Sequence, residues 1–321
     1  MRFEKASAAL SILLLLLHLT GSRTAAAQSA DVETGPLDAL REQALSLVND
    51  ARDKRGLELL ELAEPLNEAA QAHAEDMLAR DYYSHVSPEG EDVQDRYIEH
   101  GGSRWRFVAE NIATCGGCPV PPTASRVDSF HEGWMDSPEH RQNILAPGLD
   151  TFGFGIAASG ERAYAVQTFA GPGTSPGGQA AGEPTPLSPE AQLREALDAV
   201  NGRREEEGLP PLEPSDALTT VASRALAGGS GDRLIDPSAD LFSFLPGDRA
   251  DWRMLNAMAG ACGGCGTKPT AADVGHFTGN WLSNAQYRRT LLSGDVTHLG
   301  FAMNASGEGR KTAVAVVGTR R

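Results

Sequence analysis

The chain has 321 residues, of which 40% are hydrophobic, and it carries a formal charge of −15. This length suggests two domains of about 150 residues each, and the hydrophobic content is sufficient for packed cores, which excludes a disordered chain. The acidic balance argues against nucleic acid, or an anionic membrane surface, as the main partner, because phosphate binding requires clustered Lys and Arg.

The first 27 residues have the pattern of a cleaved secretory signal. Arg2 and Lys5 precede an apolar run, and Ala25 and Ala27 supply the small residues of a cleavage site. The run is too short to cross a bilayer and no second candidate follows, so we expect no transmembrane segment. Cleavage near Ala27 removes three cations and one acid and changes the formal charge from −15 to −17. We therefore expect a secreted, periplasmic or cell-surface protein.

In chain order, the apolar patterns predict three helices and a hairpin in the first half. Amphipathic patterns at helical spacing run over residues 37–55, 65–80 and 125–135. Two apolar runs, 152–158 and 163–170, are joined by a short Ser-Gly turn and predict a β-hairpin. Helices followed by strands indicate an α+β layered domain rather than a parallel α/β domain.

Two blocks of the first half recur in the second half. The first block recurs at an offset of 152 residues and the second at an offset of 147. Matched positions of the second block include Cys115, Cys118, Phe130, Trp134, Arg141 and Gly171, which correspond to Cys262, Cys265, Phe277, Trp281, Arg288 and Gly318. A period near 150 residues indicates two related domains rather than a solenoid.

A segment rich in Gly and Pro separates the two copies. Residues 171–190 hold five Gly and five Pro without apolar periodicity, which is typical of an extended linker. We therefore predict a first domain over residues 37–171, a linker over 172–190 and a second domain over 191–319.

All four cysteines lie in two Cys-Gly-Gly-Cys motifs, at Cys115, Cys118, Cys262 and Cys265. In an exported protein the leading interpretation is one local disulfide in each domain. Two alternatives remain at this point. One is a four-cysteine Zn²⁺ site between the domains, and the other is a thiol redox centre.

Five short strings of the first half follow one another in the order of a known family. They are Ser-His-Val-Ser-Pro at 84–88, Ala-Glu-Asn-Ile-Ala at 109–113, Trp-Met-Asp-Ser-Pro-Glu-His-Arg-Gln-Asn-Ile-Leu at 134–145, Gly-Phe-Gly at 153–155 and Val-Gln-Thr-Phe at 166–169. Together they resemble the CAP superfamily of cysteine-rich secretory, antigen 5 and pathogenesis-related 1 proteins (SCP domains), in its bacterial form. The resemblance implies an α+β fold of two tandem three-layer α-β-α sandwiches, each with a central antiparallel sheet.

The resemblance also implies a cavity. In relatives, two His and two Glu line this cavity. The resemblance places three of these residues at His85, Glu110 and His140, and the fourth position falls on Ser137. Two neutral imidazoles and a carboxylate can hold Zn²⁺ with an open position for water, so His85 and His140 are conditional metal ligands. The competing interpretation is that these residues are hydrogen-bonded polar groups at the edge of a core.

Other polar residues near these strings have structural interpretations. Ser137 is expected to be the N-cap of a helix, because Pro138 follows it at the first helical position. A nucleophilic role is not expected, because no nucleophile elbow surrounds Ser137. His73 lies on an apolar helix face, where a packed histidine is expected. Glu132 points away from Trp134 on the predicted helix and is expected to be solvated.

The second half lacks the three residues. Ala257 corresponds to Glu110 and Tyr287 to His140, and Leu234 is placed opposite His85. We therefore expect a degenerate second domain, kept for structure or for a partner surface. The leading hypothesis for the chain is an extracellular binding module for a lipid, glycan or protein ligand. The alternative is a metal-assisted hydrolase that uses the first-domain residues.

Overall fold

The computed structural model describes residues 36–176, 185–229, 234–236 and 239–321. The predicted signal sequence and the middle of the predicted linker lie outside these residues. Within the described part of the chain, no helix is both long enough and apolar enough to cross a membrane.

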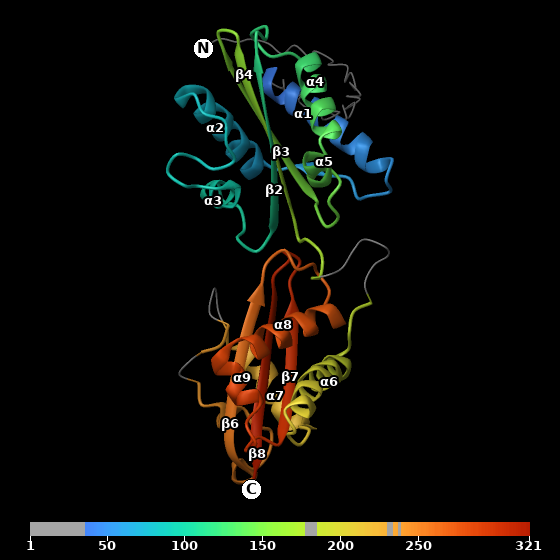
Figure 1. Cartoon of the computed structure of the whole chain (residues 1–321), viewed down its shortest axis with the longest axis vertical. Coiled ribbons are helices and arrows are strands. Elements are labelled where there is room, and N and C mark those ends of the chain that lie inside the picture. Colours follow the sequence, from blue (N-terminus) through green and yellow to red (C-terminus); the bar gives the residue numbers. More distant parts are fainter. Residues whose placement is uncertain (1–35, 177–184, 230–233, 237–238) are drawn as a thin grey trace, which may run out of the picture. The chain divides into compact units, whose positions relative to one another are not determined.

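The first domain is a sheet with helices on both faces (Figure 1). Its elements are α1 (Pro36–Asp53), β1 (Glu61–Leu62), α2 (Glu64–Arg80), α3 (Val93–Glu99), β2 (Phe107–Gly116), α4 (Ala124–Asp136), α5 (Pro138–Ile144), β3 (Thr151–Ser159) and β4 (Arg162–Gly171). The strand order is β1-β3-β4-β2, with β1 parallel to β3 and the other pairs antiparallel. Helices α2 and α3 lie on one side of the sheet and α1, α4 and α5 on the other (Figure 1). The predicted α+β sandwich is confirmed, and the short parallel β1 makes the sheet mixed.

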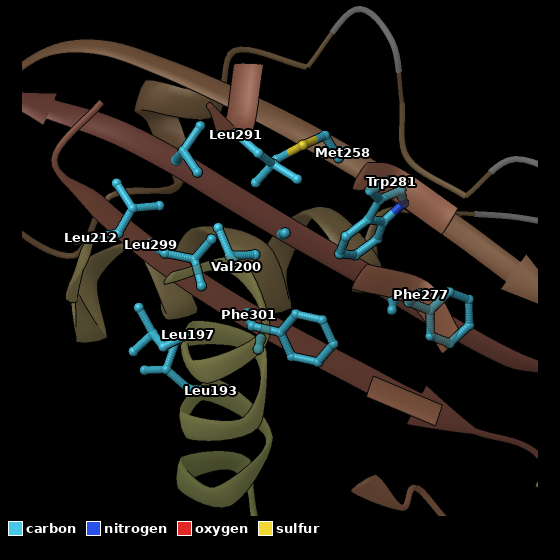
Figure 2. Close-up of a cluster of buried hydrophobic side chains, with 14 of the residues drawn as sticks. Leu193, Leu197, Val200, Leu212, Met258, Phe277, Trp281, Leu291, Leu299 and Phe301 are labelled. Atoms are coloured by element: carbon cyan, nitrogen blue, oxygen red, sulfur yellow. The ribbon is translucent and has the colours of Figure 1, made fainter. Parts of the chain in front are cut away.

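The second domain repeats this order of elements. They are α6 (Pro189–Glu206), β5 (Glu213–Pro214), α7 (Asp216–Ala227), two short 3-10 helices (Leu241–Phe244 and Arg249–Asp251), β6 (Trp252–Cys262), α8 (Ala271–Ser283), α9 (Ala285–Leu291), β7 (His298–Ala305) and β8 (Lys311–Arg320). The strand order β5-β7-β8-β6 is that of the first domain. On one face of the sheet, Leu197 and Val200 of α6 pack with Phe301 of β7 and Trp281 of α8 (Figure 2).

A glycine in each sheet allows one helix to approach closely. A Cβ added at Gly153 would lie 2.2 Å from the backbone of Leu66 in α2. A Cβ at Gly300 would lie 2.2 Å from the backbone of Leu218 in α7. Only glycine permits this approach, so these two positions fix how the helix seats on the sheet in both copies.

A buried arginine holds the same place in each domain. Arg52 of α1 is 1% exposed and donates to three backbone carbonyls, among them that of Ile144 at 2.9 Å. Arg204 of α6 is also 1% exposed and likewise donates to three carbonyls, among them that of Leu291 at 2.6 Å. Burial lowers the pKa of both guanidinium groups, and the carbonyls offset the cost of burial by accepting hydrogen bonds from their N–H groups.

The strand register corrects one matched pair of the sequence comparison. Gly318 was matched with Gly171, but it pairs with His298 in the way that Ala170 pairs with Thr151. The second hairpin is longer by one residue, which shifts every later position of β8. Matching by identity alone kept one offset through the hairpin and therefore missed this extra residue.

Each Cys-Gly-Gly-Cys motif forms its own disulfide. Cys115 bonds to Cys118 with a Cα separation of 6.0 Å, and Cys262 bonds to Cys265 with a separation of 6.1 Å. The local-disulfide interpretation is confirmed, and cysteines paired in this way are not ligands of a four-cysteine Zn²⁺ site.

Candidate functional site

Glu110 is the centre of a buried polar cluster in the first domain. It lies on β2 and is 6% exposed. Its Oε1 accepts a hydrogen bond from His85 Nδ1 at 2.8 Å, and its Oε2 accepts one from Arg96 Nη2 at 2.8 Å. Both carboxylate oxygens are therefore engaged inside the protein.

The hydrogen bond between His85 Nδ1 and Glu110 selects the tautomer of the neutral His85 ring. Because Nδ1 faces a carboxylate, the neutral ring carries its proton on Nδ1 and leaves the Nε2 lone pair free. The His85 side chain is 53% exposed although Glu110 is buried. The cluster therefore presents an oriented hydrogen-bond acceptor to solvent.

Arg96 connects the His85 loop to the carboxylate. It lies on α3, is 5% exposed, and donates to the backbone carbonyls of His85 at 3.0 Å and Glu91 at 2.9 Å as well as to Glu110. The sequence interpretation missed this residue because it did not predict α3. The available signal was the capping box at the start of α3, in which Asp92 is the N-cap and Asp95 the reciprocal partner.

His73 lies beside the cluster and is 1% exposed, as the packed-histidine interpretation predicts. Its Nε2 is 3.0 Å from the carbonyl oxygen of Ser84 and 3.9 Å from Glu110 Oε1. Burial lowers the pKa of His73, and the Glu110 carboxylate opposes that shift. His73 therefore supports the loop that carries His85.

His140 reaches this region from α5. Burial is the largest cause of the lowered pKa of His140, and the charge of His85 lowers it further. The backbone carbonyl of His140 accepts from Asn111 Nδ2 at 3.2 Å. Asn143 Nδ2 donates to the Asn111 side chain and to the Glu110 carbonyl, each at 3.0 Å. The two asparagines thus attach α5 to β2, a function that the sequence strings contained but did not reveal.

Three further polar residues lie on or beside α4 and α5. Ser137 is the N-cap of α5 and Pro138 is its first residue, as predicted, and the Ser137 side chain makes no capping hydrogen bond. Glu132 is exposed, as expected. His131 of α4 is buried, and burial lowers the pKa of its ring.

The cluster does not fit a zinc site with three protein ligands. Within the described ranges, no group of three or more His, Cys, Asp or Glu side chains could hold a metal ion. His85 and His140 supply imidazoles, but both oxygens of Glu110 are already bound to His85 and Arg96. Catalytic zinc sites have three protein ligands, and this donor set supplies two.

Two exposed apolar side chains flank His85. The Tyr83 residue is 50% exposed and Val86 is 45% exposed. The Tyr83 hydroxyl donates to the carbonyl of Ile112 on β2 at 3.0 Å, which holds the ring beside the strand. An oriented acceptor on a loop that also exposes two apolar groups can bind a ligand that has both a polar donor and an apolar face.

The second domain keeps the architecture of this region without its polar groups. Trp134 Nε1 donates to the carbonyl of Ile112, and Trp281 Nε1 donates to that of Ala259, which confirms the offset of β2 and β6. The position of Glu110 is then Ala257, which packs in an apolar cluster.

The supports of the site are also replaced. At the same offset, Met258 stands in place of Asn111 and Thr290 in place of Asn143. Tyr287 replaces His140 and packs partly against the core. The second domain therefore lacks both the ligand-facing residues and the asparagines that attach the short helix.

Comparison with known proteins identifies the same family in both domains. The sequence profile described as "Cysteine-rich secretory protein family" (CAP) matches residues 45–169 and again residues 197–318. The chain belongs to this family. Each match covers one sandwich, so the tandem CAP domains are shown, and proteins of this family are mostly extracellular.

Two sequence relatives come from Bacillus subtilis. The chain is 35% identical over 130 residues to the uncharacterized membrane protein YlbC of Bacillus subtilis, covering 40% of this chain and 33% of that protein. It is 32% identical over 124 residues to the uncharacterized protein YkwD of Bacillus subtilis, covering 39% and 45%. The match thus spans less than half the length of either relative. A crystal structure of an extracellular SCP-domain protein from Bacillus anthracis has 26% identity, covers 41% of this chain and 40% of that one, and gives a TM-score of 0.34.

Proposed function

We propose that this chain is an extracellular protein whose first CAP domain binds a lipid, glycan or protein ligand at His85 without turning it over. The observation that carries the proposal is the state of Glu110, which is buried with both oxygens engaged. A general base must reach the proton that it removes, and Glu110 is buried with a protein donor on each oxygen. Its role is to hold His85 Nε2 toward the ligand.

The surroundings of His85 support binding. Tyr83 and Val86 are exposed large apolar residues beside the exposed imidazole. Burying them under a ligand is favourable, because apolar area leaves water, while Nε2 accepts one hydrogen bond that fixes the orientation of the ligand. His140 contributes a second polar group from α5.

The alternative is a metal-assisted hydrolase that uses His85, Glu110 and His140. One observation favours it, because a carboxylate bound to Nδ1 also orients the histidines that bind zinc in other sites. The supply of only two free imidazoles counts against it.

The experiment compares binding and turnover in the same proteins. The full chain is applied to a glycan array and sedimented with vesicles of phosphatidylcholine and phosphatidylglycerol, and is then assayed with chromogenic esters, phosphomonoesters and glycosides. His85→Ala is the test variant, and His276→Ala on α8 of the second domain is the matched control.

We expect binding by wild type and His276→Ala, at least a tenfold loss in His85→Ala, and no turnover. Hydrolysis that His85→Ala abolishes, together with zinc retained after dialysis, would instead establish the alternative. Binding that His85→Ala leaves unchanged would contradict the proposed site.

A further inference from the structure

The second domain has an apolar groove between α6 and α7, whose lining includes none of the positions that correspond to His85, Glu110 and His140. The groove has a volume of about 590 Å³. Its floor is formed by Leu193 and Leu197 of α6 and by Leu212, which are 8%, 8% and 3% exposed. Figure 2 shows these three side chains on neighbouring segments. Small-molecule sites in proteins have volumes of roughly 300 to 1,000 Å³, so the groove is large enough for one.

In the first domain, polar side chains stand at the matching positions. Arg41 of α1 donates to the carbonyl of Phe154 at 3.3 Å. Asn67 of α2 accepts from the amide of Phe154 at 3.1 Å, and Gln71 accepts from the amide of Ile156 at 3.0 Å. These side chains extend from both helices to the backbone of β3.

The second domain has shorter or apolar residues at these three positions. At the offset of 152 residues, Leu193 replaces Arg41, Thr219 replaces Asn67 and Ser223 replaces Gln71. Gln192 makes one compensating bond, to the amide of Met303 at 3.2 Å. The residues at the groove therefore differ in kind from those at the matching positions of the first domain.

Carboxylates border this groove. Glu190, Asp198 and Asp216 are exposed residues of its lining, and Arg194 is the cation among them. Glu190 and Asp216 lie in the first turn of a helix, where the helix dipole already accounts for acidic residues. Asp198 lies in the middle of α6, where the dipole gives no such reason. The border carries three negative charges and one positive charge.

We propose that this groove binds a small organic cation that has an apolar body, of the alkylammonium class. The leucine floor removes the apolar body from water, and the carboxylates accept charge-assisted hydrogen bonds from the ammonium group. The same border repels a carboxylate on an otherwise identical body. This proposal concerns the second domain and is independent of the function proposed for His85.

The experiment uses two probes of equal length and opposite charge. n-Octylamine, which is an ammonium ion at pH 7, and sodium octanoate are titrated into the full chain in a calorimeter at low salt. We expect saturable binding of octylammonium and at least tenfold weaker binding of octanoate. Absence of saturable octylammonium binding, or equal binding of octanoate, overturns the proposal.

Two variants locate the binding. Leu193→Arg combined with Thr219→Asn gives the groove the residues of the first domain, and we expect it to abolish binding while circular dichroism shows an intact fold. Asp198→Asn should weaken octylammonium binding about threefold, the size of a partly exposed ion pair. Glu205→Gln, an equal change of charge on α6 outside the groove, should leave it unchanged.

The two single variants still test the proposal if the double variant does not fold. Asp198→Asn and Glu205→Gln then have to differ, and equal affinities in those two variants overturn the proposal. Undiminished binding by a folded double variant also overturns it.

Discussion

At the scale of single residues, the first domain uses buried polar groups for two different purposes. Arg96 and Glu110 form a buried ion pair that orients His85, which remains half exposed. Arg52 is equally buried but binds only backbone carbonyls. The Arg96–Glu110 pair supports an exposed side chain, His85, and we therefore assign it to the candidate site. The contacts of Arg52 lie within the fold, and we therefore assign them to stability.

His131 gives a prediction about pH. Its ring is 8% exposed against α1, and its Nδ1 is buried without a hydrogen-bond partner among the described residues. Burial is the largest cause of its lowered pKa; Asp128 and Asp50 oppose the shift and Lys54 adds to it. The folded state therefore favours the neutral ring, and its contribution to stability is present above the unfolded pKa of about 6.5 and is lost as the pH falls below it.

We expect His131→Phe to reduce the loss of stability between pH 7.5 and pH 5, measured by urea unfolding of the full chain. His276→Phe is the control on the equivalent helix α8, where the ring is only partly buried. An unchanged pH dependence in His131→Phe would show that other groups cause the acid sensitivity.

At the scale of elements, the sequence predicted the helices and strands that are long enough to show a periodic pattern of apolar residues. The helices α1, α2 and α4 and the hairpin β3–β4 were predicted close to their ends. Strand β2 was not, because both of its faces are covered and the adjacent residues Glu110 and Asn111 are both buried, which removes the alternation. Helices α3 and α5 have seven residues each, too few for a periodic signal.

The candidate site was predicted to the same extent as its elements. His85, Glu110 and His140 were found through resemblance, because their strings are distinctive. Arg96 was missed with α3, and no pattern reveals that an arginine 14 residues before Glu110 reaches its carboxylate. The contact depends on how α3 packs against β2, which is a tertiary property.

The attachment of α5 to β2 gives a prediction at this scale. Asn143→Leu removes the hydrogen bonds to the Glu110 carbonyl and to Asn111. We expect a loss of about 1 to 3 kcal/mol of unfolding free energy, because buried polar partners are left unpaired. The helix that carries His140 should also shift, which a changed titration of His140 in an NMR experiment would detect.

Thr290→Leu is the matched control for this prediction. Thr290 holds the equivalent position on α9, and its hydroxyl bonds within its own helix. It should change stability little. If Asn143→Leu leaves the titration of His140 as in wild type, the asparagines do not position that helix.

At the scale of the whole molecule, duplication has kept the structural groups and replaced the site. Arg52 and Arg204 make the same three-carbonyl contact, while Glu110 has become Ala257. Each domain also has its own hydrophobic clusters, and none of those in the described residues combines side chains from both domains. We infer that stability is maintained separately in each copy.

Matched arginine variants test this separation. Arg52→Met removes the donor of one buried and two partly buried hydrogen bonds to carbonyls in the first domain, and Arg204→Met does the same in the second, each at a cost of about 3 kcal/mol. Hydrogen exchange of the full chain, followed by mass spectrometry, should show faster exchange of β3 and β4 in Arg52→Met and of β7 and β8 in Arg204→Met. The exposed Arg55→Met should change neither. Faster exchange in both sheets from either single variant would mean that the two copies unfold as one cooperative unit, which would require contacts between them to outweigh their separate cores.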